Sequence, residues 1–500
     1  MNLNQRFQLF KRGASMMLGS ATGQWEGWER NRLRARPSAK LESQDKSLDC
    51  GTREQLLAEA RSLCQVFPVA KRILHKFSAY TVGDLRYKWS TPDVTWNEQA
   101  RDYWYSWMDR ADANGRHRFT KLASLATIGM LRDGDMFCAY VPAGPLGRDI
   151  QVRLIEADRI GNYRGGSQNY DDASQNITGG IIHDAGGRPV SYRLNTRGQW
   201  GNFFFQADVP AAQVRHLFDP DRVDAVRGVT AFHAVLNHMR DMKETIDAEK
   251  AAIKQHSKIA LLVKSVMGGA RSGFGGITLN ENADGSANDA EVNVQEVNDA
   301  MTAYMFPTED MKPFQSNRPD KGWMDFQTLM LELIAVGLSL PVSVVLKMTG
   351  TGPAVRHDMA DAQRTFDATM DTLEEKFLDP TVAFVTANAI ERGLLPPNPQ
   401  WFKFERQRPS SITIDMGRES KANISENEAW LRSGTDIFAE DGKDHSEEVR
   451  RIAAERALRY KAAEEAAQKF NVPIDYILAS SESISLAVKQ KNINAPAKTT

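Results

Sequence analysis

The sequence predicts a multi-domain α+β protein, and three observations lead to this fold class. The chain has 500 residues, which is more than one hydrophobic core usually holds. Its apolar residues recur with helical spacing at first, then alternate as in strands, and later return to helical spacing over long segments. Two of these long segments enclose a stretch of about 65 residues with a different composition. We therefore expect a mixed helix-and-strand part, a pair of long helices with a small insertion, and a helical C-terminal part.

Composition and charge exclude several classes of protein. Hydrophobic residues make up 41% and charged residues 25%, as in folded globular proteins, and the formal net charge is −1. Proteins that grip DNA tightly usually carry a basic excess, because affinity comes from neutralising phosphates. The balance argues against a DNA clamp, but not against a surface along which DNA slides. The cysteines are Cys50, Cys64 and Cys138, without a CxxC pair, which indicates reduced thiols rather than a zinc site.

The first half of the chain predicts a basic arm followed by a mixed α/β unit. Residues 1–50 are basic and carry Trp25 and Trp28; both a flexible arm that packs on a neighbouring subunit and a nucleic-acid contact remain open. The start lacks a long apolar stretch and a cleavage site, so no signal peptide is expected. Helices are predicted over 54–78 (interrupted at Pro68), 95–111 and 118–131, and strands over 136–141, 150–155, 180–183, 190–194 and 203–205.

A long helix is predicted over residues 229–256, where apolar residues step by three and four. Such spacing is typical of a seam that packs on another helix. The helix would be roughly 42 Å long at 1.5 Å per residue, and a helix of this length needs a packing partner. Lysine takes two of the eight seam positions, which are Val229, Phe232, Leu236, Met239, Lys243, Ile246, Lys250 and Ile253.

The second half predicts a small unit and then further helices. Residues 259–266 read as a strand, followed by clustered glycines and an acidic stretch over 280–299. A second long helix runs from Met324 to about Leu340, and a third carries Met359 to Phe377 on one face. The apolar stretch Thr328–Leu346 could span a membrane, but a helix buried between subunits is favoured. Helices are expected over 419–433 and 445–470 (the second with Asp444 as its cap), and a disordered tail over 480–500.

The chain shows no motif of catalysis or cofactor binding. There is no GxxxxGK[ST] loop, HExxH or GxSxG, so no cofactor and no enzymatic activity are predicted. Asp133-Gly134-Asp135 places two carboxylates at a turn, for which a hairpin turn is favoured over a metal site.

Several segments, in their order and spacing, resemble the portal proteins of lambda-type tailed phages over roughly residues 50–460. The stretch 349–363 departs from the serine-rich junction usual in that family. The segments are EARSLCQVFPVAKRILHKFSAYTVG (59–83), YWYSWMDRADANGRHRFTKL (103–122), LRDGDMF (131–137), RLIEADRIGN (153–162), VRHLFDPDRVDAVRGVTAFHAVL (214–236), LIAVGLSLPVSVVL (333–346) and ITIDMGRESKANISENEAWLRSGTDIFAEDGKDHSEEVRRIAAE (412–455).

The resemblance implies a multi-domain portal fold that assembles as a ring, normally of twelve subunits, at one capsid vertex. The parts would be an N-terminal arm (1–50), an α/β wing (51–227), stem helices (228–256 and 322–340), a small α/β clip (257–321), a tunnel loop (341–356), a long helix with the wing return (357–418), a helical crown (419–478) and a tail (479–500).

The resemblance also implies a function and partners. The ring would be assembled in the host cytoplasm and conduct double-stranded DNA, without sequence specificity, into and out of the virion. Expected partners are the terminase large subunit, head–tail adaptors, and major capsid and scaffold proteins, with no membrane. The expected ring contacts are the eight seam residues, the DNA-facing loop residues are Lys347, Met348, Thr349, Thr351 and Arg356, and the docking residues of the clip are Glu281, Asp284, Asp289, Glu291 and Glu296.

One alternative from another class stays open. A metal-dependent phage DNA-processing enzyme, such as a nuclease, could use the carboxylates of Asp133, Asp135 and Glu156.

Overall fold

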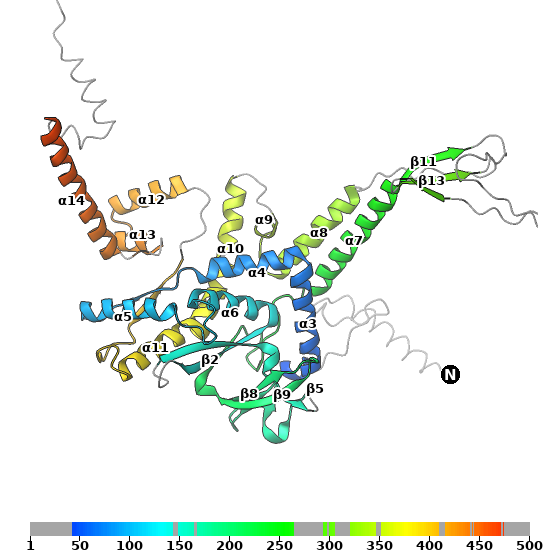
Figure 1. The fold of residues 1–500 in the computed structure, drawn as a ribbon, viewed down its shortest axis with the longest axis horizontal. Helices are drawn as coiled ribbons and strands as arrows, with labels where there is room; N and C mark the ends of the chain where they lie inside the picture. The colour runs from blue at the N-terminus through cyan, green and yellow to red at the C-terminus, as the bar shows by residue number, and fades with distance from the viewer. Residues whose placement is uncertain are drawn as a thin grey trace, which may run out of the picture. The chain divides into compact units, whose positions relative to one another are not determined.

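The computed structural model describes residues 43–143, 149–164, 168–264, 294–297, 300–305, 321–346, 352–409, 416–440, 443, 445–471 and 474. The chain divides into two units, Met1–Asp49 with Arg222–Ala225, and Cys50–Asp221 with Val226–Thr500. Of the first unit the structure describes residues 43–49 and 222–225, including the short helix α2 (Gln44–Ser47). All other described elements belong to the second unit (Figure 1).

Four helices form the first part of the second unit. The predicted helix over 54–78 is two helices, α3 (Cys50–Val66) and α4 (Pro68–Val82). Pro68 takes the first position of α4, where a missing N–H costs nothing. The helix α5 (Val94–Met108) begins after Asp93, whose side chain accepts a hydrogen bond from Trp96 N at 3.1 Å. The helix α6 (Phe119–Asp133) follows, so the helical spacing predicted these elements correctly.

Two antiparallel sheets make up most of the strand structure. One has the order β10-β2-β3 and the other the order β6-β7-β8-β9. Smaller pairs join β1 to β14 and β4 to β5. The strands are β1 (Arg86–Trp89), β2 (Asp135–Ala143), β3 (Asp149–Glu156), β4 (Tyr163–Arg164), β5 (Gln168–Asn169), β6 (Ile177–Thr178), β7 (Ile181–His183), β8 (Pro189–Arg197), β9 (Phe203–Pro210), β10 (Val214–Phe218) and β14 (Phe404–Gln407).

Two long helices, α7 (Leu236–Lys258) and α8 (Lys321–Gly337), lie side by side and bracket a small sheet (Figure 1). That sheet contains β11 (Ile259–Lys264), β12 (Val294–Val297) and β13 (Ala300–Met305), with β11 parallel to β13. The predicted start of the first long helix at residue 229 was wrong. Thr230 Oγ1 accepts from Phe232 N at 3.2 Å and Ala231 N donates to Leu131 O at 2.8 Å, so these groups make non-helical bonds.

The rest of the described chain is mostly helical. The predicted loop over 341–356 is shorter than expected, because it contains α9 (Val342–Val345) and because α10 begins at Gly352. The helix α10 (Gly352–Leu373) continues through a π-helical turn (Glu374–Leu378) into α11 (Asp379–Glu391), with Pro380 in its first turn. The C-terminal helices are α12 (Met416–Glu428), α13 (Gly434–Glu440) and α14 (His445–Phe470); Asp444 and residues 475–500 lie outside the described residues.

An aromatic core joins α5, α6, the π-helical turn and the β10-β2-β3 sheet. Trp104 and Trp107 stack with ring centroids 5.1 Å apart, and Phe119 packs against both. Trp104 Nε1 donates to Leu85 O at 3.2 Å and Trp107 Nε1 to Ile150 O at 2.7 Å. The buried indole N–H groups are therefore satisfied, as a tight aromatic core requires.

A second core joins α7 and α8 to α3, α4, α9 and α10. Phe232, Leu236 and Met239 belong to this core and are at most 4% exposed. These three seam residues therefore pack inside their own chain, which contradicts their predicted role in contacts between subunits. The seam is real, but its covering residues come from the same chain and include Phe77, Ile334 and Phe366.

Truncating Met239 tests this placement. We expect Met239→Ala to lower the free energy of unfolding by about 2–5 kcal/mol, because it opens a cavity in a packed core. Chemical denaturation of the purified chain, followed by circular dichroism, measures the change. Ile253→Ala is the control: Ile253 is exposed on the same helix, and its truncation should change stability by about 0.5 kcal/mol or less. Equal effects of the two substitutions would contradict the placement.

Candidate functional site

The two seam lysines bind a carboxylate of their own helix. Lys243 Nζ lies 2.8 Å from Asp247 Oδ2, and Lys250 Nζ lies 3.5 Å from Asp247 Oδ1. As seam residues they were expected to contact a partner subunit, but the i,i+3 and i,i+4 spacing provides a carboxylate on the same helix. Val229 and Ile246 are half-buried, and Ile253 is exposed. Only the C-terminal half of the predicted seam is thus free for contacts outside the chain.

The outward face of α8 carries an apolar stripe whose residues were not among the predicted ring contacts, although a helix buried between subunits was expected here. Its inner face, which includes Met330 and Ile334, is buried in the second core. The spacing of three, four and three residues places the exposed side chains on one face. We call these four residues, which are 42–73% exposed, the α8 stripe: Phe326, Leu329, Leu333 and Val336.

A helix that is apolar on two faces normally has both faces covered. Within the described residues, no helix is long and apolar enough to cross a membrane. Because a row of exposed apolar side chains is typical of protein contact sites, the α8 stripe is a candidate contact surface for protein. The apolar stretch Thr328–Leu346, whose single charged residue is Glu332, was the available signal, since it has more apolar residues than one buried face needs.

The residues predicted for a DNA-facing loop and for a docking surface are mostly not placed. Lys347, Met348, Thr349 and Thr351 lie outside the described residues, and Arg356 is exposed in the first turns of α10. Glu281, Asp284, Asp289 and Glu291 also lie outside them. Glu296 belongs to strand β12, where only its backbone is described.

A buried ion pair fixes the point where the chain leaves the sheet toward α7. Arg227 Nε lies 2.6 Å from Asp135 Oδ2, and both side chains are at most 3% exposed. The other carboxylate oxygen, Asp135 Oδ1, accepts from Gly228 N at 2.7 Å and contacts His216 Nε2 at 2.9 Å. Arg227 also donates to the carbonyl oxygens of Ala157, Ile160 and Gly179. The pair is therefore hydrogen-bonded on nearly every side, as a buried ion pair must be.

Two glycines allow the backbones at this pair to meet. Gly134 has φ +88°, and a Cβ at Gly228 would lie 2.1 Å from Gly134 O. No other residue type fits this close approach. The Asp133-Gly134-Asp135 turn therefore joins the helix α6 to the strand β2, and the predicted hairpin turn was wrong.

Burial and charge act in opposite directions on the two titratable groups of this site. Burial alone would raise the pKa of Asp135, but the Arg227 charge and the hydrogen bond from His216 hold that pKa well below its usual range. Burial lowers the pKa of His216, and this outweighs the hydrogen bond with Asp135. At neutral pH the site therefore contains an ionised aspartate and a neutral histidine.

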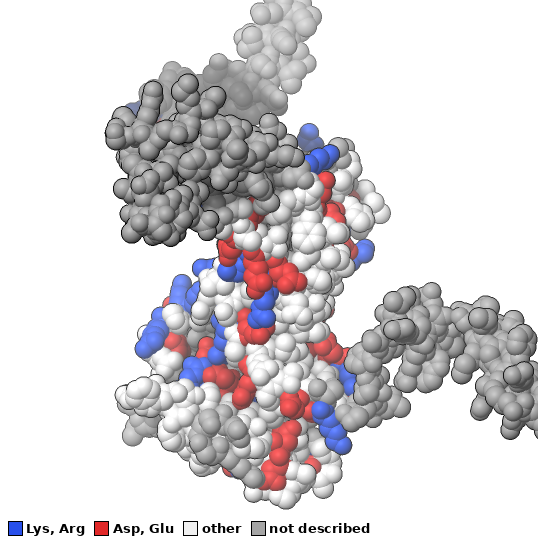
Figure 2. Space-filling model, turned by 90° about the vertical axis from the view of Figure 1, so that its right-hand side faces the viewer, with Lys and Arg blue, Asp and Glu red and all other residues white. Residues whose placement is uncertain are grey.

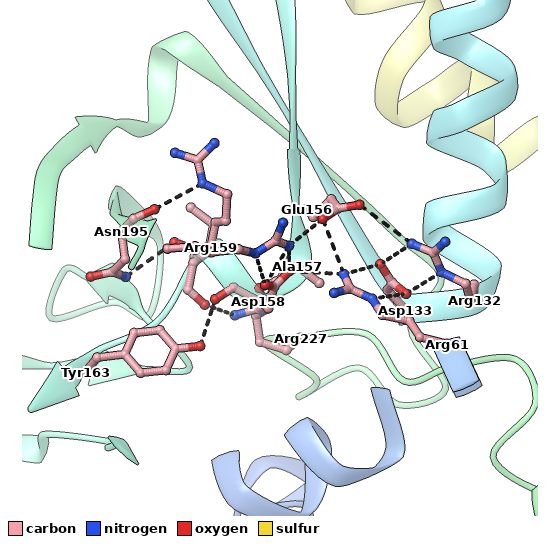
Figure 3. A network of polar contacts seen from close by, with 12 residues as sticks. Arg61, Arg132, Asp133, Glu156, Ala157, Asp158, Arg159, Tyr163, Asn195 and Arg227 are labelled. Atoms are coloured by element: carbon pink, nitrogen blue, oxygen red, sulfur yellow. Dashed lines mark hydrogen bonds and ion pairs between the residues drawn. The ribbon is translucent and has the colours of Figure 1, made fainter. Parts of the chain in front are cut away.

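A second charged network lies beside the pair and links α3, α6, β3 and β8 (Figure 3). Arg61 Nε and Nη2 donate to the two carboxylate oxygens of Asp133 at 3.0 and 2.7 Å, and Nη2 also donates to Asp158 Oδ1 at 3.0 Å. Arg132 Nε donates to Asp133 Oδ1 at 2.7 Å. Arg197 Nε donates to Asp158 Oδ2 at 2.7 Å. Such bidentate arginine–carboxylate contacts fix the positions of the elements that carry them.

These contacts argue against the nuclease alternative. Asp133, Asp135 and Glu156 each form ion pairs with arginine, which occupies the oxygens that a catalytic metal would need. Nowhere in the described part of the chain do three or more His, Cys, Asp or Glu side chains gather in a way that could hold a metal ion.

The surface charge is mixed. Figure 2 shows acidic and basic side chains interspersed on the face that it presents, separated by uncharged surface. This agrees with the near-zero net charge and differs from the continuous basic surface of a tight DNA binder.

Comparison with known proteins identifies the family. A match to "Phage portal protein, lambda family" covers residues 30–369. The chain belongs to the lambda family of phage portal proteins. The resemblance to this family is thereby confirmed, with the segments between residues 59 and 346 inside the matched range and the segment 412–455 outside it. The family is structural rather than enzymatic.

One curated relative and several solved structures are similar to parts of this chain. The chain is 26% identical over 153 residues to a "Probable portal protein" of Halomonas phage phiHAP-1, a match that covers 30% of this chain and 29% of the relative. It is also similar to a chain in the virion of a native gene transfer agent particle (14% identity, 77% and 90% of the two chains covered, TM-score 0.38). Another similar chain belongs to the neck of such a particle, computed with C12 symmetry (13% identity, 77% and 93% covered, TM-score 0.39).

Removing one charge of the buried pair should destabilise this portal-family chain strongly. We expect Asp135→Asn to lower the free energy of unfolding by about 3–5 kcal/mol, because Arg227 would remain buried with its charge uncompensated. Urea denaturation measures the loss. Asp247→Asn, which removes an exposed ion pair on α7, is the matched control and should leave the free energy of unfolding nearly unchanged. A loss at Asp135 no larger than at Asp247 would contradict the assignment.

Acid should destabilise the chain in two steps. His216 stays neutral when folded but takes up a proton when unfolded, so stability should fall as the pH drops below about 6.5. The contribution of ionised Asp135 is complete above the usual aspartate pKa of about 3.9 and should be lost progressively below it. Unfolding free energies measured from about pH 7 down to about pH 2 test both steps. His216→Gln should remove the first step only, and an unchanged slope near pH 6 in that variant would contradict it.

Proposed function

We propose that this chain is the portal subunit of a tailed phage and that it forms a ring, normally of twelve copies, through which double-stranded DNA enters and leaves the capsid. The family match supports the portal function, and the α8 stripe is the single structural observation that supports assembly. The proposed site of action is the portal vertex of the virion, after assembly in the host cytoplasm.

Ring closure needs two different surfaces on each subunit, because only a head-to-tail contact can close into a ring of many copies. The α8 stripe is one such surface. A second one is formed on the neighbouring helix α7 by exposed side chains that include Lys250 and Ile253. We propose that the α8 stripe of one subunit packs against α7 of the next. Phe232, Leu236 and Met239 take no part in it, since they pack inside the subunit.

The mixed charge suits a DNA conduit. Many unpaired cations would bind phosphates through counterion release and hold the moving duplex. Lys243 and Lys250 on α7, by contrast, are paired with Asp247. We propose that the DNA backbone is contacted by residues in the first turns of α10 and in the segment before it, namely Lys347, Met348, Thr349, Thr351 and Arg356.

The insertion between α7 and α8 is the proposed docking part. The terminase large subunit would bind it during packaging and head–tail adaptors afterwards, through Glu281, Asp284, Asp289, Glu291 and Glu296. Contacts with major capsid and scaffold proteins would fall on the α/β part of the subunit.

A charge in the α8 stripe should prevent assembly without unfolding the subunit. We expect Val336→Asp to reduce the ring fraction at least tenfold, because burying one unpaired carboxylate between subunits costs several kcal/mol, about 3–5. Val336 is 73% exposed in the single chain, so the melting temperature of the subunit should stay unchanged. Mass photometry and negative-stain electron microscopy measure the rings.

Leu394→Asp is the matched control, because Leu394 is exposed in the turn after α11 and lies outside the stripe. Its rings should equal those of the unchanged chain. Full ring formation by Val336→Asp would exclude the stripe as the contact, and absence of any ring from the unchanged chain at high concentration would exclude the proposed function.

A further inference from the structure

The outer face of α4 carries charge of one sign only. Among the described helices, α4 is the one that contains basic residues and no acidic residue. Its inner face is buried in the second core. Lys71, Arg72 and Lys76 lie on the other side of the helix, with exposed His75 between them. We call Lys71, Arg72 and Lys76 the α4 basic face.

The charges of this face are not compensated within the described chain. The side chains of Lys71 and Arg72 have no hydrogen-bond or ion-pair partner among the described residues. Lys76 Nζ donates to Tyr80 Oη at 3.1 Å and lies 5.0 Å from the centre of that ring, contacts that leave its charge in place. Residues 60–83 contain no Asp or Glu, so no neighbour in the sequence supplies a counter-charge.

The composition of the α4 basic face suits phosphate better than a protein partner. Protein contacts usually centre on large apolar or aromatic side chains, and lysine is depleted there. The exposed residues of α4 include no large apolar side chain; they are Pro68, Lys71, Arg72, His75 and Ala79. A row of phosphates needs only cations, because affinity comes from the release of counterions. Charge complementarity therefore favours the backbone of a nucleic acid as the occupant.

The helix α4 is anchored to the helices that flank the residues proposed above to contact DNA. It contacts both α9 and α10, which lie before and after residues 347–351 in the chain (Figure 1). Phe77 of α4 packs edge-on against Phe366 of α10, with ring centroids 5.1 Å apart. One core therefore supports both the α4 basic face and exposed Arg356 of α10.

We propose that the α4 basic face is a further contact for the phosphate backbone of double-stranded DNA. The proposal rests on the proposed function, which brings a duplex to the subunit. The contact would not select a sequence, since phosphates carry no sequence information directly. Three cations give a weak contact, and each step along the duplex offers an equivalent phosphate, so the DNA can still slide.

The salt dependence of DNA binding tests the proposal. Fluorescence anisotropy measures binding of the full chain to a labelled duplex of about 30 base pairs between about 50 and 200 mM NaCl. Each phosphate contact contributes about 0.9 to the slope of log Kd against log salt concentration. Lys71→Gln combined with Arg72→Gln should therefore lower the slope by about 1.8 and weaken binding about tenfold or more at about 0.1 M salt. Two duplexes of unrelated sequence should respond alike.

Two further variants separate charge from structure. Lys71→Arg combined with Arg72→Lys keeps both charges and should bind DNA as the unchanged chain does. Arg456→Gln combined with Arg459→Gln is the matched control, because it removes two exposed arginines of α14 that also have no partner among the described residues. Their helix carries acidic residues as well, so this control should leave the slope unchanged. All three variants should keep the melting temperature, since the residues are exposed.

Three results would overturn the proposal: no binding of either duplex by the unchanged chain at about 50 mM salt, equal slopes for the two glutamine variants, or a loss confined to one duplex sequence. An acidic protein segment is the alternative occupant, and a synthetic peptide of residues 280–299 serves as its probe. If binding of this peptide but not of DNA depends on Lys71 and Arg72, the face docks acidic protein and the proposal is wrong.

Mass photometry of the same samples separates this proposal from the proposed function. Rings whose DNA binding keeps its slope in the Lys71 and Arg72 variant would contradict the α4 contact alone. Absence of rings from the unchanged chain at high concentration would contradict the proposed function, whatever the slopes.

Discussion

The ion pair of Arg227 and Asp135 is the interaction on which the arrangement of the α/β part and the long helices depends. A buried charge is tolerable only when its partner and its hydrogen bonds are all in place. This requirement fixes the start of β2, the backbone of Gly228 and the carbonyls of the segment after β3 in one geometry. Since Arg227 precedes α7 by only nine residues, the direction in which α7 leaves is set there. The network of Arg61 and Asp133 fixes α3 and α6 in the same arrangement.

The Arg227–Asp135 pair and the Arg61–Asp133 network together explain how the long helices could carry the contact surface of the proposed ring. A helix pair that carries a contact surface must hold it at a fixed angle, or copies cannot close into a ring. The inner face of α8 packs on α7, α9 and α10, so the α8 stripe is presented by a supported helix rather than by a free one. The small sheet between α7 and α8 then continues from two helices whose bases are fixed.

Sequence periodicity predicted most helices and strands, but it did not identify what covers each face. The steps of three and four from Val229 to Ile253 correctly indicated a buried face, yet the same pattern arises whether the cover is another chain or the chain's own α4 and α10. The early start predicted for α7 failed because Thr230 satisfies backbone groups in a non-helical way. The family resemblance marked the segments with Asp135 and Arg227 separately. That they meet is a long-range fact, 92 residues apart, that no local pattern contains.

Charged and apolar side chains have different places in the subunit. Ion pairs hold its own elements together, and apolar side chains are exposed where contacts with other proteins are proposed. The ion pairs that organise the subunit are internal, because Arg227, Arg61 and Arg132 bind carboxylates of the same chain. Among the described surfaces, the α8 stripe exposes a row of large apolar side chains. Exposed basic side chains attract DNA phosphates over a distance set by the ionic strength. Apolar contacts stabilise only surfaces that are buried against each other, and they do not attract phosphate. This division would suit the proposed portal subunit, which binds neighbouring proteins firmly and DNA weakly.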